Sequence, residues 1–172
     1  MPIKTIVFND KAYPEFQSKG FAAQFAFPFA AHLCKGFGID VGYSDVRWML
    51  PNAFTGVEPS IDPTFHDMNL PDNPNDPHGQ WDFIFSSHCL EHVDDWTSTL
   101  LYWKTRLKPG GVLFLYLPHY SQEYWRTWNN RKHRHNLSPE MLSDFFKSTG
   151  WTKSFTTGSD LNNSFYAVAE NN

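Results

Sequence analysis

Residues 112–118, with the sequence VLFLYLP, most constrain how this 172-residue chain can fold. A strand that is apolar on both faces must be covered on both faces, as in parallel sheets flanked by helices. A second strand-like run, WDFIFSS at 81–87, precedes it. Between them, the segment 94–107 carries apolar residues at helical spacing. This alternation predicts a largely parallel sheet with helices on both faces.

Weaker patterns extend this order in both directions. GIDVG at 38–42 and FTGVE at 54–58 predict short strands, and KPGG at 108–111 predicts a turn. The segment 138–150 predicts a helix with Ser138 as its N-cap, Pro139 in the first turn and Gly150 as its stop. The runs 151–158 and 164–170 then predict a closing antiparallel pair. PDNPNDPHG at 71–79 is typical of a plain loop.

The N-terminal part is expected to be helical, because apolar residues recur there at steps of four: Phe21, Phe25, Phe29 and Leu33. Pro28 interrupts this face and predicts a kink or two short helices. We expect a single domain over 1–172. It would comprise an N-terminal helical segment at 1–36, covering the ligand site, and an α/β core at 37–169.

Composition narrows the class of protein. A net charge of −4 argues against a general nucleic-acid binder, which normally carries a basic surplus. Cys34 and Cys89 have neither CxxC nor zinc spacing, which favours buried thiols in a reducing compartment. The chain has no apolar run of the roughly 20 residues that cross a bilayer. We therefore expect a cytoplasmic monomer or homodimer with no membrane partner.

Ligands of open parallel sheets bind beyond the carboxyl ends of the strands. Asp40 and Gly42 follow the first core strand, and Glu58 ends the second. A glycine turn followed about 15 residues later by an acid resembles the arrangement that binds nucleotide-type cofactors. Asp67 and the segment SSHCLEHV at 86–93 come next in the chain.

The run WDFIFSSHCLEHVDDW, followed by LKPGGVLFLYLP, resembles the S-adenosylmethionine-dependent methyltransferases of the Rossmann-like class, in the branch whose post-strand loop reads LEHV. The resemblance covers roughly 37–169. It implies an α/β fold: a Rossmann-like, mostly parallel sheet with helices on both faces and a C-terminal antiparallel hairpin. The stretch between Glu58 and Asp67 is too short for the usual helix and strand. We therefore expect the sheet to be truncated at the edge after the second strand.

The resemblance implies S-adenosylmethionine as the cofactor. IDVGYSD at 39–45 looks like a worn form of the family's first motif, because Tyr43 and Ser44 replace a small residue and a glycine. The Tyr43 ring would either contact the sulfonium or narrow the pocket. The remaining cofactor contacts implied are Asp40 and Gly42 (methionine portion), Glu58 (ribose), Pro59, Asp67 and Met68 (adenine), and Ser86 and His88 (ammonium and sulfonium).

Methyl transfer to a hydroxyl also needs a general base, most often a histidine. His119 directly follows the strand 112–118 and is the candidate catalytic residue. His88, Glu91 and His92 are alternatives. Glu91 and His92 could ligate a metal in some relatives of this family, but two residues do not make a metal site, so we predict no bound metal from them.

The segment 119–135 places aromatic rings on one helical face, with positive charge between them. One interpretation is an exposed helix with a solvated charged face. The other is a lid over the acceptor, which would be a small molecule, anionic or sugar-like. The candidate substrate-binding residues are Tyr120, Tyr124, Trp128, His133 and His135.

Two other functions stay open. The worn first motif also fits a non-catalytic relative that keeps the fold as a binding module. A nicotinamide-dependent oxidoreductase is disfavoured by the missing glycines and by the LEHV loop. Calorimetry with S-adenosylmethionine, its demethylated product and NAD distinguishes the three.

Overall fold

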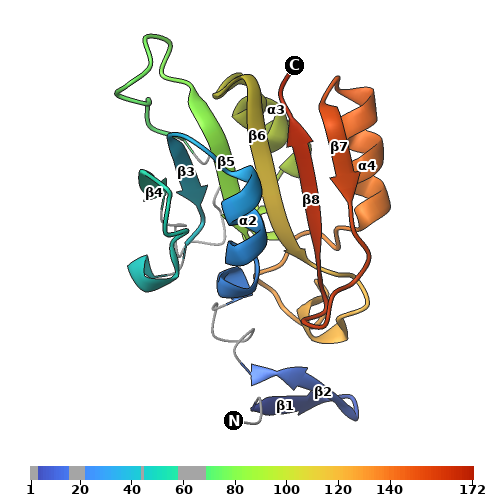
Figure 1. Cartoon of the computed structure of the whole chain (residues 1–172). Helices are drawn as coiled ribbons and strands as arrows, with labels where there is room; N and C mark the ends of the chain where they lie inside the picture. The colour runs from blue at the N-terminus through green and yellow to red at the C-terminus, as the bar shows by residue number, and fades with distance from the viewer. Residues whose placement is uncertain (1–3, 16–21, 44, 58–68) are drawn as a thin grey trace.

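The computed structural model describes residues 4–15, 22–43, 45–57 and 69–172. Its main sheet has the strand order β4-β3-β5-β6-β8-β7 (Figure 1). The first four of these strands run parallel, β8 pairs antiparallel with β6, and β7 pairs antiparallel with β8. The strands are β3 (Gly38–Val41), β4 (Thr55–Val57), β5 (Trp81–Ser87), β6 (Leu107–Pro118), β7 (Thr152–Thr156) and β8 (Ser164–Glu170). The predicted Rossmann-like α/β fold is confirmed, and within the described part β4 is the last strand on its edge.

The sheet has a topological switch point between β3 and β5. From β3, the chain first adds β4 on one side and then crosses to add β5 on the other. Connections on either side of such a point leave the sheet in opposite directions and open a crevice at the carboxyl ends of the strands. Gly42 and the loop after Ser87 lie at the carboxyl ends of β3 and β5, where this rule places a ligand.

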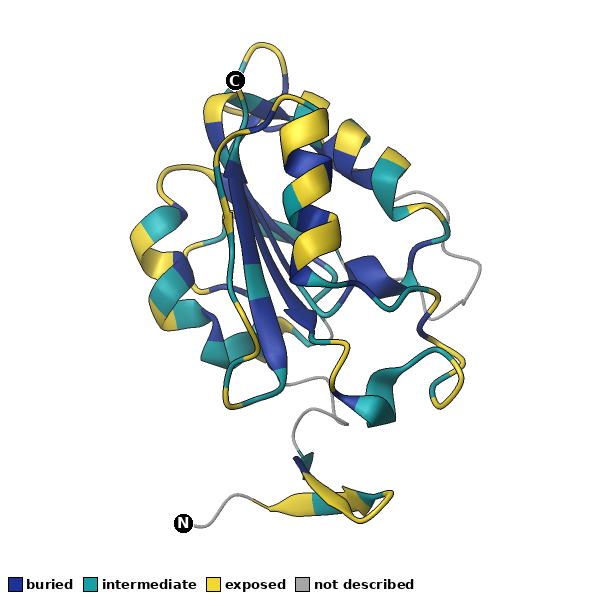
Figure 2. Ribbon diagram, turned by 90° about the vertical axis from the view of Figure 1, so that its right-hand side faces the viewer, coloured by how far each residue is buried: buried dark blue, intermediate teal, exposed yellow. Residues whose placement is uncertain are grey.

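Helices cover both faces of the sheet, as Figure 2 shows in a view turned by 90°. Helix α2 (Phe27–Leu33) packs on one face, and α3 (Trp96–Thr105) and α4 (Pro139–Ser148) pack on the other. Strand β6 supplies both cores: Leu113 and Leu115 join the α3/α4 side, whereas Phe114 and Tyr116 join the α2 side. This two-sided burial explains the unbroken apolar run. Short 3-10 helices are η1 (Ala22–Phe25), η2 (Val46–Trp48), η3 (Leu90–His92) and η4 (Glu123–Trp125).

Helix α4 begins and ends as the sequence predicts. The Ser138 hydroxyl accepts a 3.3 Å hydrogen bond from the Met141 N–H, and Pro139 occupies the first turn. Of the kink or the two short helices predicted near Pro28, the structure has two short helices, η1 and α2. Pro28 lies in the first turn of α2. Phe21 lies outside the described residues.

The expectation of a helical segment over 1–36 is wrong for residues 5–14. There, β1 (Thr5–Phe8) and β2 (Lys11–Pro14) form an antiparallel hairpin. Asn9 and Asp10 both have positive φ, 49° and 59°, which is the geometry of a tight two-residue hairpin turn. The apolar steps of four begin only at Phe21, so they carry no information about residues 5–14, where the two-residue turn sets the local structure. The hairpin lies beyond the carboxyl ends of the parallel strands (Figure 1).

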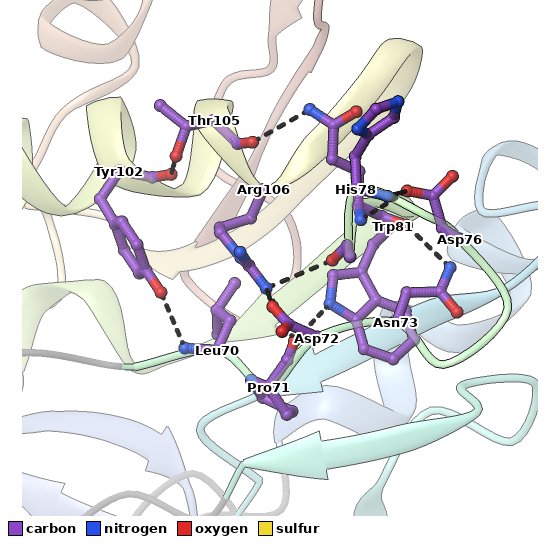
Figure 3. Close-up of polar contacts among 12 residues, drawn as sticks. Leu70, Pro71, Asp72, Asn73, Asp76, His78, Trp81, Tyr102, Thr105 and Arg106 are labelled. Carbon is purple, nitrogen blue, oxygen red and sulfur yellow. Dashed lines mark hydrogen bonds and ion pairs between the residues drawn. The ribbon is translucent and has the colours of Figure 1, made fainter.

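Two further segments differ from the sequence-based expectation. The predicted turn KPGG lies within β6, where the register against β5 shifts. The predicted plain loop 71–79 is internally bonded and tied to the end of α3 (Figure 3). Asn73 is buried and donates to the Gln80 carbonyl at 2.7 Å, while Arg106 donates to the Pro71 carbonyl and pairs with Asp72. These contacts lie at the amino end of β5, away from the crevice.

Candidate active site

The chain leaving β3 turns sharply at Gly42. Its φ is +93°, and a Cβ on this residue would lie 2.4 Å from both Cβ and Sγ of Cys89. Only glycine fits this conformation and this close approach without strain. The turn after β3 and the loop after β5 are therefore in direct contact, on the two sides of the switch point.

Asp40 lies in β3, two residues before Gly42, and is buried. Its Oδ2 accepts a 2.6 Å hydrogen bond from the Leu50 backbone N–H, which ties the loop after β3 back to the strand. Burial raises the pKa of this carboxyl to about 7, and the hydrogen bond from Leu50 opposes the rise. The side chain thus has a structural partner within the protein.

Tyr43 lies against β4. A Cβ on Gly56 would be 2.5 Å from the Tyr43 ring and 2.9 Å from the Met49 sulfur, so the absence of a side chain at Gly56 leaves room for this ring. Gly56 is the register partner of Asp40. The ring therefore covers the strand that leads to the predicted ribose-binding position. The predicted cofactor contacts Glu58, Pro59, Asp67 and Met68 lie outside the described residues.

Strand β5 delivers Ser86, Ser87 and His88 to the crevice. Ser86 is fully buried beside the Cys89 thiol. His88 has a φ of +49°, and its Nε2 lies 3.0 Å from Ser164 Oγ on β8. Burial, and secondarily His92, lowers the pKa of His88 to about 3, so its ring is neutral at physiological pH.

Glu91 follows in η3 and is fully buried, with three imidazoles around it. Its Oε1 lies 3.9 Å from His88 Nδ1, 3.7 Å from His92 Nε2 and 3.9 Å from His133 Nε2. Burial raises the pKa of Glu91 to about 8 and lowers that of His133 to about 2. The approach of His133 was not predicted, because the sequence separates it from Glu91 by a segment without regular periodicity.

A small pocket lies beside this cluster, at the carboxyl end of β6. It brings together His119, Tyr120, His133 and His135, all of which were predicted acceptor-site residues. Burial lowers the pKa of His119, and its Nδ1 accepts a 3.2 Å hydrogen bond from the Ser121 N–H. The pocket is lined by Pro118, His119, Tyr120, Gln122, Trp125, Arg126, His133, His135, Asn136 and Leu137.

The predicted helical face across Tyr120, Tyr124 and Trp128 is wrong. Of the segment 119–135, only η4 is helical, because side chains such as those of Asn130 and His119 bond nearby backbone groups and compete with helix formation. The pocket lining includes neither Tyr124 nor Trp128.

These two rings have other surroundings. Tyr124 packs edge-on against Phe8 of the hairpin, and Trp128 is two-thirds exposed beside the Arg126 guanidinium. Sequence reasoning also missed Trp125, whose ring stacks on His133 at 5.1 Å with an interplanar angle of 10°. Its position among other aromatic residues offered no signal to single it out.

Comparison with known families decides the class of this protein. A family model described as a methyltransferase domain matches residues 25–154. The chain belongs to the methyltransferase domain family. The match spans the switch point, the loop after β5 and the pocket at the end of β6, whereas Ser164 of β8, the partner of His88, follows the matched residues.

Solved structures share the fold of this methyltransferase domain. An S-adenosylmethionine-dependent methyltransferase from Thermotoga maritima is 18% identical with a TM-score of 0.64, and the match covers 92% of this chain and 95% of that one. A chain from the complex of the Haloferax volcanii methyltransferase activator Trm112 with a methyltransferase is 14% identical, also with a TM-score of 0.64, over 91% and 94%. The plantazolicin methyltransferase BpumL, solved with S-adenosylhomocysteine, is 10% identical with a TM-score of 0.56, over 91% and 85%. No curated protein matches the sequence.

Two other expectations concern the rest of the methyltransferase domain. Cys34 and Cys89 are both buried and free, as predicted from their spacing. Within the ranges that the structure covers, no helix is both long and apolar enough to cross a bilayer.

Proposed function

We propose that this methyltransferase domain binds S-adenosylmethionine at the switch point and methylates a small-molecule acceptor, anionic or sugar-like. The observation that carries the proposal is the contact between Gly42 and Cys89, which joins the turn after β3 to the loop after β5. Nucleotide-type cofactors of this fold bind across that junction. The acceptor pocket at the end of β6 lies next to the same loop.

The residues of the crevice fit such a cofactor. The Ser87 hydroxyl, at the end of β5, is buried and has no hydrogen-bond partner among the described residues. A buried hydroxyl without a partner is unfavourable, and the polar methionine end of a cofactor would satisfy it. Ser86 and His88 flank this position, with Asp40 and Gly42 across the switch point.

The remaining cofactor contacts are proposed from the family resemblance. Glu58 would accept hydrogen bonds from the ribose hydroxyls, and Pro59, Asp67 and Met68 would surround the adenine. Tyr43 would lie over the strand that leads to Glu58. The N-terminal segment 1–36 remains the proposed cover of the site, with the hairpin at the open end of the sheet.

The bound cofactor supplies a methyl group made electrophilic by its sulfonium. The protein's contribution is to align the acceptor and to exclude water. His119 is the proposed catalytic residue. Because its Nδ1 accepts from Ser121, a neutral ring carries its proton on Nε2 and can donate to the acceptor oxygen. To act as a base, this ring would first have to release Ser121.

The pocket lining supports the choice of acceptor. Arg126 is the cationic residue that lines it, and its Nε donates to the Tyr120 carbonyl at 2.9 Å. His135 and Asn136 add polar groups to the same wall. An anionic or hydroxyl-rich molecule would find donors on several sides. His133 is proposed to contact it from the side of Glu91, whereas Tyr124 and Trp128 would act only at the pocket margin.

Calorimetry with S-adenosylhomocysteine tests the proposal. We expect binding on the order of micromolar, and Glu58→Ala should weaken it by about 1.5–3 kcal/mol, the range for hydrogen bonds to a charged group. Asp144→Asn, at an exposed position on α4, is the matched control and should change nothing. Affinity no stronger than millimolar for the wild type would overturn the enzyme and favour a binding module.

A further inference from the structure

The cluster around Glu91 has the geometry of a metal-binding site. One ligand atom from each of Glu91, His92 and His133 lies within 4.8 Å of the other two. The closest approaches to Glu91 Oε1 are 3.7 Å and 3.9 Å, which are too long for hydrogen bonds. The three groups therefore converge without bonding to one another.

An independent observation concerns the Glu91 carboxylate itself. The side chain is fully buried, and neither oxygen has a hydrogen-bond partner among the other described residues. A buried acidic side chain that receives no hydrogen bond from another described residue is unfavourable, and buried charges in proteins are paired or coordinate metals. A cation held between the carboxylate and the two imidazoles would neutralise the buried carboxylate and accept the lone pairs of the imidazole nitrogens.

The histidines are held in the orientation that metal ligands need. His92 Nδ1 lies 2.7 Å from the Lys132 carbonyl oxygen. A carbonyl only accepts, so Nδ1 carries the proton and the lone pair of Nε2 faces Glu91. Metal-bound histidines are commonly fixed in this way by a carbonyl on the other nitrogen. The stacked ring of Trp125 holds His133.

We propose that Glu91, His92 and His133 bind a divalent transition-metal ion such as Zn²⁺. Two imidazole nitrogens and one carboxylate oxygen are a ligand set of zinc sites that keep an open position. Bonds of about 2.0–2.1 Å place tetrahedral ligands roughly 3.3 Å apart. The ligand atoms would therefore have to move closer together from their present spacings of 3.7 Å, 3.9 Å and at most 4.8 Å. This differs from the expectation drawn from Glu91 and His92 alone, because His133 supplies the third ligand.

The proposed ion would act on the acceptor, a role that rests on the proposed function. His133 lines the acceptor pocket, so the open position is within reach of a ligand there. An oxygen bound to the metal has a lowered pKa and releases its proton to solvent. That oxygen then forms the new C–O bond while the methyl–sulfur bond breaks, and sulfur keeps the electron pair as a neutral thioether. His119 need not serve as the base.

The test uses the full chain after its metal has been removed with EDTA. Co²⁺ is titrated into it and binding is monitored by visible absorption, and Zn²⁺ binding is then measured by calorimetry. We expect one equivalent of each ion to bind. Glu91→Gln, which preserves shape, should weaken Zn²⁺ binding by more than the roughly 10–100-fold that outer-shell changes produce. His133→Gln should do the same and is the second variant if the first is unstable. Thermal unfolding of each protein without metal checks the fold.

His78→Ala is the matched control, because His78 is exposed on the loop 71–79. It should leave the affinity for Zn²⁺ unchanged. The inference is overturned if the wild type binds no Zn²⁺, or if His78→Ala weakens binding as much as Glu91→Gln. Calorimetry with S-adenosylhomocysteine on the same samples separates the two proposals. Zn²⁺ binding without cofactor binding would overturn the proposed function alone, and the reverse would overturn the metal site alone.

Discussion

The Asp40 carboxylate accepts a 2.6 Å hydrogen bond from the backbone N–H of Leu50, ten residues further along the chain. Both residues are buried, and Asp40 lies on β3, next to the edge strand β4, where its register partner is Gly56. The loop between β3 and β4 is thereby anchored to the strand that it leaves. The anchoring group is the Asp40 carboxyl, whose charged form is disfavoured by burial. The contribution of Asp40 to the stability of the fold therefore depends on pH.

Asp40→Asn should flatten the pH dependence of stability between about pH 4 and 7. Burial raises the pKa of Asp40 from 3.8 to about 7, so the folded protein holds this proton while the unfolded chain releases it. The contribution of the protonated group is fully present below 3.8 and is lost as the pH rises through 7. Asparagine keeps the acceptor for Leu50 and does not titrate.

Urea denaturation of both proteins at several pH values measures the difference. The nearby thiols of Cys34 and Cys89 have pKa values raised to about 12 by burial and stay neutral throughout. Parallel curves for wild type and mutant would contradict the assignment. Asp144→Asn, at an exposed position, controls for the loss of one charge.

Gly42→Ala should destabilise the protein more than Gly110→Ala. Both glycines have positive φ, +93° and +77°, so each alanine adds strain of roughly 1–2 kcal/mol. At Gly42 the new Cβ also meets Cys89 at 2.4 Å, whereas at Gly110 it meets no described atom within 4 Å. The extra overlap should add about 1–3 kcal/mol. Equal midpoints in thermal unfolding would show that the contact with Cys89 is not limiting.

Tyr43→Gly should weaken S-adenosylmethionine more than S-adenosylhomocysteine, by about 2- to 30-fold. The ring is aromatic, only the donor carries a sulfonium charge, and a cation–π contact contributes about 0.5–2 kcal/mol. Tyr43→Phe, which keeps the ring against Gly56, should change the ratio little. Both ligands are titrated against the wild type and the mutant. Equal weakening of the two ligands would argue against the charge effect, and tighter binding of both would indicate that the Tyr43 ring obstructs the site.

Asn73→Ala should lower the free energy of unfolding by about 1–3 kcal/mol, because it removes a buried amide and leaves the Gln80 carbonyl and the Asn75 N–H without their partner. Asp72→Asn in the same loop should cost at most about 1 kcal/mol, since its ion pair with Arg106 is exposed on the Asp72 side. Chemical denaturation compares the two variants. A larger effect at Asp72 would mean that the ion pair, not the buried amide, holds this loop.

The regular elements of the core could be predicted from sequence because their causes are local. The unbroken apolar run 112–118 required cover on both faces, and Ser138 with Pro139 marked the start of α4. The same reasoning failed at 5–14, where the helical prediction was extended beyond the apolar pattern and a turn at Asn9 and Asp10 forms a hairpin. It also failed at 119–135, where polar side chains bond the backbone in place of a helix.

The sequence by itself determined the strands of the main sheet, the turn at Gly42 and the loop after β5, and with them the family to which the chain belongs. Only the tertiary structure decided which side chains meet. His133 reaches Glu91 because the backbone N–H groups of Arg134 and His135 donate to the Glu91 carbonyl, and the ring of Trp125 holds the imidazole in place. Such contacts depend on the path of a segment without periodicity, which local propensity does not specify.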